Sequence, residues 1–107
     1  MSVLPAVRLG DVCTGHDCHP ARPNNSASPN VYINGLGAHR VGDSWAPHAC
    51  PPPAPPHTSV LKSGSPSVFV NGLSLGRVSD PIVCGSFCAE GSPDVFVGLS
   101  VGTPAGS

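Results

Sequence analysis

The sequence predicts an all-β protein made of three β-hairpin units, related by a pseudo-threefold axis and joined by irregular loops. Three observations predict this fold. One phrase of the chain recurs at a fixed spacing, each copy reads as a hairpin, and no segment has the apolar period of a useful helix. The segments between copies are rich in Pro, Gly, Ser and Cys, which is typical of irregular loops.

The repeat covers most of the chain. The stretch "SPNVYINGLGAHRVGD" (28–43) aligns with "SPSVFVNGLSLGRVSD" (65–80) without a gap, and "SPDVFVG" (92–98) begins a third copy. The head "LPAVRLGD" (4–11) is the second half of a copy without its first half. We expect the two half-copies to complete one another, so that residues 1–107 form a single domain of three units.

Each copy carries a strong hairpin signal. Asn34-Gly35 follows the apolar residues "VYI", and Asn71-Gly72 follows "VFV". Both residue types tolerate positive φ, which a type I′ turn requires at its two central positions.

Equivalent strand positions predict two faces. Six aliphatic residues are expected to point inward around the axis: Val31, Val68, Val95, Ile33, Val70 and Val97. Three aligned aromatic residues fall on the opposite face: Tyr32, Phe69 and Phe96. These aromatics either cover the edge of a small core or form a threefold contact surface for a symmetric partner.

The three loops offer metal-capable side chains at nearly the same offset from a repeated aspartate. The residues four or five positions after Asp11, Asp43 and Asp80 are, in order, His16, His48 and Cys84. The longest loop adds His57. Equivalent positions near a threefold axis converge, so we expect one zinc ion held by His16, His48, His57 and Cys84 in a closed, structural site.

Other interpretations of these residues remain open. The histidines could be ordinary loop residues. Cys18 and Cys50 are also equivalent, seven positions after their aspartates, so they could form a disulfide or replace His16 and His48 as ligands.

The remaining cysteines and histidines have no matching partners in the repeat. Cys13 and Cys88 are interpreted as packed thiols, and His19 is a weaker ligand candidate. His39 lies in a hairpin arm and is interpreted as a surface or strand residue.

The composition argues against several functions. Charged residues make up 10% of the chain and the net charge is −1, so there is no basic patch for nucleic acid. No apolar run is long enough to span a bilayer, and the N-terminus lacks the features of a signal peptide, so export would need a dedicated machine. No nucleophile, metalloprotease or phosphate-binding motif is present, which predicts a protein that is not an enzyme and has no small-molecule substrate.

The repeated phrases resemble those of the PAAR-repeat family, named after a Pro-Ala-Ala-Arg motif. The motif is degenerate here, as "PAVR" (5–8), "GAHR" (37–40) and "SLGR" (74–77), but its arginine is kept as Arg8, Arg40 and Arg77. Ser79 stands where glycine is usual. The loops "TGHDCHPARP" and "DSWAPHACPPPAPPH" look like those of phage-encoded members.

The resemblance implies a small cone with a zinc ion near its apex, bound by histidines and a cysteine. It implies that the base of the cone sits on the end of a homotrimeric β-helical spike, one chain per trimer, and makes transient contact with a target membrane. In a phage the protein would be made in the host cytoplasm and end at the tail baseplate tip. The alternative is a bacterial type VI secretion tip that loads effectors, binds a VgrG-type spike and is exported from the cytoplasm.

Overall fold

A computed structural model describes residues 3–16, 19–48 and 57–98. Within them, short antiparallel strands make four separate pairs, β1 with β8, β2 with β3, β4 with β5, and β6 with β7. The strands are β1 (Val3–Pro5), β2 (Tyr32–Ile33), β3 (Leu36–Gly37), β4 (Ser44–His48), β5 (His57–Val60), β6 (Phe69–Val70), β7 (Leu73–Ser74) and β8 (Phe96–Gly98). The described residues contain no helix, and so none that could cross a membrane. The predicted all-β class is confirmed.

The two complete hairpins turn at the predicted dipeptides. The β2–β3 turn has φ of 55° at Asn34 and 79° at Gly35, and the β6–β7 turn has 54° at Asn71 and 79° at Gly72. Two consecutive positive φ angles define the type I′ turn, whose twist matches that of the flanking strands.

The third hairpin is assembled from the two ends of the chain. β1 pairs with β8, with Leu4 opposite Val97 and Pro5 opposite Phe96. The same register holds in the complete hairpins, where Ile33 lies opposite Leu36. The half-copies at the two chain ends therefore form the third unit.

Three backbone hydrogen bonds close a ring around the pseudo-threefold axis. The Val7 amide donates to the Gly76 carbonyl (2.9 Å), the Gly76 amide to His39 (2.8 Å), and the His39 amide to Val7 (3.0 Å). These residues are equivalent in the repeat, so each unit donates to one neighbour and accepts from the other. Three further bridges follow the same cyclic order: Arg8 with Ala38, Arg40 with Leu75, and Ala6 with Arg77.

The apolar core has two clusters along this axis. The cluster at the hairpin end consists of Ala6, Ile33, Ala38, Val70, Leu75 and Val97. The cluster at the loop end consists of Val7, Cys13, Trp45, Leu61, Ile82 and Cys88. Adjacent residues such as Ala6 and Val7 supply different clusters, because successive side chains of extended backbone point to opposite faces.

The prediction was wrong for three of the six residues that were expected to point inward. Ile33, Val70 and Val97 are buried as expected, but three valines are 38–39% exposed: Val31, Val68 and Val95. Each of these valines ends a Ser-Pro turn, and its amide is bound by a serine hydroxyl, as in Val31 to Ser28 Oγ at 3.0 Å. The alternation expected of a longer strand therefore does not reach them.

The interpretation of His39 as a surface or strand residue was also wrong, since its side chain is fully buried and the residue lies outside the strands. The equivalent Gly76 has no side chain, and a Cβ built there would lie 2.8 Å from Cδ2 of Leu61, which fills that space. The His39 ring is held by its Nδ1, which lies 2.9 Å from the Ser26 carbonyl. It also packs edge-on against Trp45, with ring centroids 5.0 Å apart.

Candidate functional site

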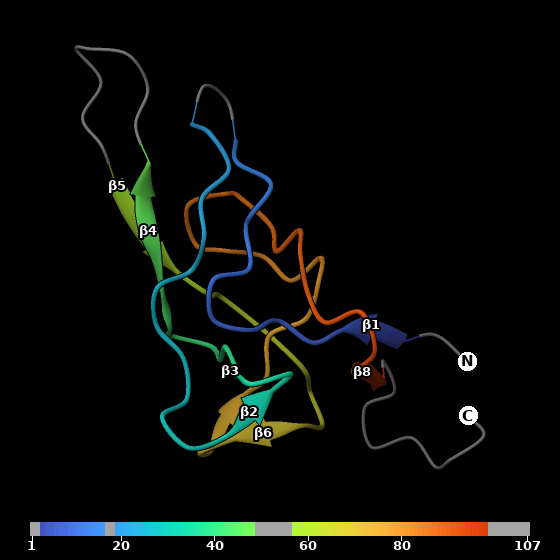
Figure 1. Cartoon of the computed structure of the whole chain (residues 1–107). Coiled ribbons are helices and arrows are strands. Elements are labelled where there is room, and N and C mark those ends of the chain that lie inside the picture. The colour runs from blue at the N-terminus through green and yellow to red at the C-terminus, as the bar shows by residue number, and fades with distance from the viewer. Residues whose placement is uncertain (1–2, 17–18, 49–56, 99–107) are drawn as a thin grey trace.

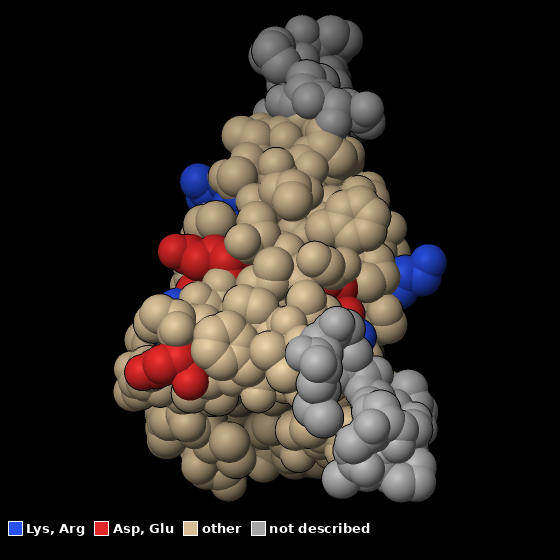
Figure 2. All heavy atoms as spheres, turned by 90° about the vertical axis from the view of Figure 1, so that its right-hand side faces the viewer, with Lys and Arg blue, Asp and Glu red and all other residues tan. Residues whose placement is uncertain are grey.

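The molecule has two distinct ends. The three loops and the β4–β5 pair extend toward one end, and the repeat hairpins lie at the other (Figure 1). The described atoms narrow toward the loop end, and on the face shown in Figure 2 acidic and basic side chains are scattered rather than gathered into a patch.

Each unit passes from its hairpin into its loop through the same closed turn. In the middle unit Asp43 Oδ2 accepts from the Arg40 amide (2.8 Å) and Nε (2.9 Å), and Oδ1 accepts from Nη2 (3.0 Å). The Asp43 amide donates back to the Arg40 carbonyl at 2.9 Å. The Arg8–Asp11 and Arg77–Asp80 turns repeat these contacts.

The environment of this turn shifts the pKa of both partners. Burial would raise the pKa of Asp43, but hydrogen bonds from the Arg40 guanidinium and amide hold it below its usual range. The hydrogen bond to Asp43 raises the pKa of Arg40 despite partial burial. Both groups therefore stay charged, and the Asp43 carboxylate has a structural role in closing the turn.

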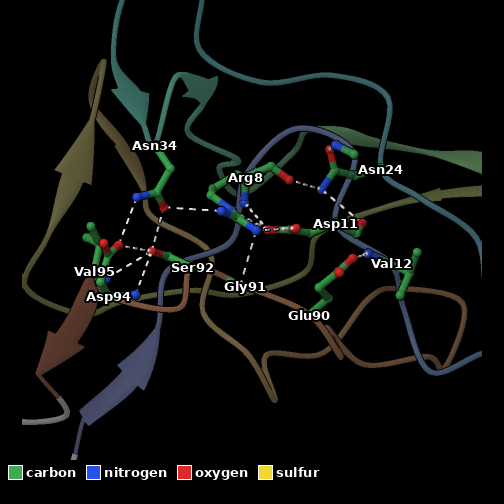
Figure 3. Close-up of polar contacts among 11 residues, drawn as sticks. Arg8, Asp11, Val12, Asn24, Asn34, Glu90, Gly91, Ser92, Asp94 and Val95 are labelled. Atoms are coloured by element: carbon green, nitrogen blue, oxygen red, sulfur yellow. Dashed lines mark hydrogen bonds and ion pairs between the residues drawn. The ribbon is translucent and has the colours of Figure 1, made fainter.

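Two of these arginines, Arg8 and Arg40, connect neighbouring units through a polar network that sequence reasoning missed. Arg8 Nη1 donates to Asn34 Oδ1 at 3.1 Å, and Ser92 Oγ donates to the same oxygen at 2.6 Å (Figure 3). Asn34 Nδ2 then donates to Asp94 Oδ1 at 2.8 Å. The Asn-Gly signal identified Asn34 as a turn residue, but its contacts cross to another unit.

The next junction repeats this network. Arg40 Nη1 and Ser28 Oγ both donate to Asn71 Oδ1, at 2.9 and 2.6 Å. The third junction differs, because the repeat position of the two asparagines is Gly98, which has no side chain. The polar network is therefore built at two of the three junctions.

At the loop end, hydrogen bonds of the backbone and of side chains hold the loops together. The Ala46 amide donates to the Pro23 carbonyl at 2.9 Å, which joins the first loop to β4. Arg22 Nε donates to the carbonyl of Pro47, next to His48, at 3.2 Å. On the other side the Cys84 amide donates to Oγ of Ser59 in β5 at 2.9 Å.

The structure places the four predicted zinc ligands on these joined loops. His48 and His57 are paired across the β4–β5 ladder, and the half-buried Cys84 contacts β5 through its backbone. His16 closes a tight turn with His19, through reciprocal backbone hydrogen bonds of 3.0 and 2.7 Å.

No three His, Cys, Asp or Glu side chains form a group able to hold a metal among those that the structure describes. The side chains of His48 and His57 are not among them, and Cys18 and Cys50 also lie outside the described residues. The complete ligand set therefore stays a prediction.

The hairpin end presents the three predicted aromatic residues to solvent. Tyr32 is 60% exposed, Phe69 57% and Phe96 50%. Other exposed aliphatic residues of the hairpins are Val31, Val68, Val95, Leu36 and Leu73. Together with the aromatics they form a set of apolar side chains, which we call the base residues.

The family model for the PAAR motif matches residues 14–88. The chain belongs to the PAAR-motif family. No curated protein matches the sequence significantly. Membership supports a spike-tip type of protein in a contractile injection machine, which associates with a spike trimer and is a component of a phage tail or a type VI secretion apparatus.

The structure explains why the arginine is the motif residue that all three copies of this PAAR protein keep. The residue before each arginine is Val7, His39 or Gly76, and its contribution to the axial ring is a backbone amide and carbonyl, which every residue type except proline supplies. The arginine side chain itself makes the aspartate contacts and, in two copies, the contact to the next unit. Lysine would not replace it, because a single ammonium cannot reproduce the forked geometry.

Proposed function

We propose that this PAAR protein caps the end of a homotrimeric β-helical spike, with one chain on each trimer. The observation that carries the proposal is the closed ring of Val7, His39 and Gly76, which gives one chain approximate threefold symmetry. A single chain can then present similar surfaces to all three subunits of a symmetric partner.

The base residues supply the chemistry of the contact. Exposed aromatic side chains at equivalent positions are enriched at protein interfaces, where they bury large areas at a low cost in side-chain entropy. We infer that Tyr32, Phe69 and Phe96 each contact one subunit of the spike. The short outer edges of the hairpins could extend the sheets of the spike by strand pairing.

The loop end fits the role of a tip. Its exposed side chains include Val60, Val83 and Phe87, which are apolar. Low charge lowers the cost of entering a bilayer, so transient contact with a target membrane is favoured over contact with nucleic acid. We infer that the tapered loop end is the part that meets the membrane.

A structural zinc ion is part of this proposal. His16, His48, His57 and Cys84 would hold it, and imidazole and thiolate are the donors that zinc prefers. The ion would connect the three loops at the end of the molecule opposite the hairpins. It would give rigidity where the chain has few large apolar side chains to pack.

The machine that carries the tip is proposed to be a phage tail baseplate, because the loops resemble those of phage-encoded PAAR proteins. The protein would then be made in the host cytoplasm and be incorporated into the virion. The alternative is a type VI secretion tip that also loads effectors on a VgrG-type spike.

The experiment is to mix the full chain with a purified spike trimer from the same genome and measure mass and affinity. We expect one chain per trimer. The triple variant Tyr32→Ala, Phe69→Ala, Phe96→Ala should bind at least tenfold more weakly while melting at nearly the same temperature. Phe87→Ala, at the loop end, is the matched control and should bind normally.

Equal losses in the base and control variants would contradict the assignment of the hairpin end as the docking face. Failure to bind either a phage or a type VI spike trimer would contradict the capping role itself. Binding to only one of the two identifies the machine.

A further inference from the structure

We propose that Cys13 and Cys88 are a disulfide-forming pair, which closes when the folded protein reaches oxidising surroundings and covalently joins its first and third loops. The repeat alignment offered no partner for either cysteine. The fold places them directly opposite one another in an antiparallel bridge. Both are free thiols in the structure.

The hydrogen bonds around the bridge identify its type. The Thr14 amide donates to the Phe87 carbonyl (2.8 Å), and the Ala89 amide donates to the Val12 carbonyl (3.0 Å). These bonds flank the two cysteines, so the cysteines form the non-hydrogen-bonded kind of pair. Opposite Cα atoms in such pairs lie about 4.5 Å apart with their side chains close, which is within the range that disulfides span.

Further contacts hold this register. The Phe87 amide donates to Thr14 Oγ1 at 3.1 Å on one side of the pair. The Val12 amide donates to Glu90 Oε1 at 3.1 Å on the other. The Arg22 amide donates to Cys13 Sγ at 3.3 Å, which orients that sulfur. The pair can therefore close without a shift of register between the two loops.

The buried position of the two cysteines slows the reactions of both the dithiol and the disulfide form. Cys13 and Cys88 are each 2% exposed, in the loop-end cluster with Trp45, Leu61 and Ile82. Burial, with smaller contributions from Asp80 and Cys13, raises the pKa of the Cys88 thiol, so little reactive thiolate forms there. The dithiol is therefore slow to react in a reducing cytoplasm, and the closed disulfide is shielded from reductants afterwards.

The chemistry needs an oxidant, which is a small-molecule disulfide such as glutathione disulfide. When the bridge opens locally, one cysteine thiolate attacks a sulfur of the oxidant, forms a mixed disulfide and releases one thiolate. The second cysteine thiolate then attacks the first cysteine sulfur and releases the other thiolate. The pair loses two protons and two electrons, and the oxidant leaves as two thiols.

The proposed bond is separate from the proposed zinc site, because Cys84 is not one of the pair. It does not depend on which machine carries the protein, only on transfer from reducing to oxidising surroundings. It would covalently join two loops whose contact is otherwise made by a few hydrogen bonds and by packing in the loop-end cluster.

The experiment equilibrates the purified full chain, with its five cysteines, in oxidised and reduced glutathione mixtures containing enough urea to permit local opening. Remaining thiols are alkylated in denaturant, and mass spectrometry of the peptides maps the linkage. We expect a linkage of Cys13 to Cys88 that reductant reverses. The oxidised protein should melt roughly 10 °C or more above the reduced protein, because the bond closes a long loop.

Cys13→Ser and Cys88→Ser should each abolish both the linkage and the gain in melting temperature. Two outcomes would overturn the proposal: full alkylation of Cys13 and Cys88 after equilibration in the oxidised buffer, or linkage of either cysteine chiefly to Cys18, Cys50 or Cys84.

Discussion

Ser79 and Gly42 occupy the same position in the closed turn between hairpin and loop, and both have left-handed backbone, with φ of 84° and 90°. The third copy has Gly10 there, with φ of 91°. The position is third in a β-turn whose fourth residue is the repeated aspartate, and positive φ at this place favours glycine. Ser79 is thus a strained departure from the repeat.

Replacing Ser79 with glycine should stabilise the protein by about 0.5–1 kcal/mol, because glycine adopts this φ without the steric cost of a Cβ. Urea unfolding followed by circular dichroism measures the change. Ser79→Ala is the matched control: it removes the hydroxyl and keeps the strain, so its stability should stay close to that of the unmodified protein. If Ser79→Ala stabilised the protein as much as Ser79→Gly, the positive φ at this position would not be the cause of the gain in stability.

Replacing Asp43 with asparagine should destabilise the fold by about 2–3 kcal/mol, because it removes the charged acceptor of a largely buried arginine. Asp11→Asn and Asp80→Asn should cost similar amounts, since their turns make the same contacts. Thermal and urea unfolding test all three. Glu90→Gln is the control: it keeps the exposed oxygen that accepts a hydrogen bond from the Val12 amide, so we expect almost no change in stability. A loss of stability as large as that of Asp43→Asn would show that the change in net charge, and not the turn, is the cause.

His39 should make the fold less stable in mild acid. Burial lowers the pKa of its ring, and Nδ1 lies 2.9 Å from the Ser26 carbonyl, which can only accept, so Nδ1 carries the proton of a neutral ring. Below the unfolded pKa of about 6.5, the unfolded chain binds a proton more readily than the folded one. The contribution of the neutral His39 ring to the free energy of unfolding is therefore fully present above that pH. It decreases as the pH falls toward the pKa that His39 has in the folded protein.

The test compares unfolding free energies of the unmodified protein and of His39→Gln between pH 7.5 and pH 5. The advantage of the unmodified protein over the variant should shrink as the pH falls. Other titrating groups, including the proposed zinc ligands, are common to both proteins and cancel in the difference. A constant difference would rule out titration of His39.

Removal of zinc should strongly destabilise the protein. We expect about one zinc ion per chain by elemental analysis, and a loss of apparent stability on the order of 10 kcal/mol on chelation, as for other structural zinc sites. His57→Ala and Cys84→Ala should each reduce zinc content and melting temperature sharply. His39→Gln should retain zinc, so it controls for the general loss of a histidine. Absence of zinc from freshly purified protein would contradict the site.

Local sequence patterns were sufficient to predict much of the fold. Asn34-Gly35 and Asn71-Gly72 form the predicted turns because their preference for positive φ is a property of the residues themselves. The pairing of β1 with β8 could be inferred because the two half-copies complement each other in sequence. The positions of Tyr32, Phe69 and Phe96 on an exposed face likewise followed from alignment.

The sequence by itself therefore determined the repeat, its hairpins and the equivalence of positions. Only the tertiary structure decided that His39 is buried, that Val31 is exposed, and that Cys13 lies opposite Cys88. The reason is physical: these outcomes depend on neighbours far away in the chain. His39 is buried because its backbone bonds Val7 and Gly76 of the other two units at the axis and its ring packs against Trp45. Alignment of equivalent positions does not show which distant residues surround a side chain.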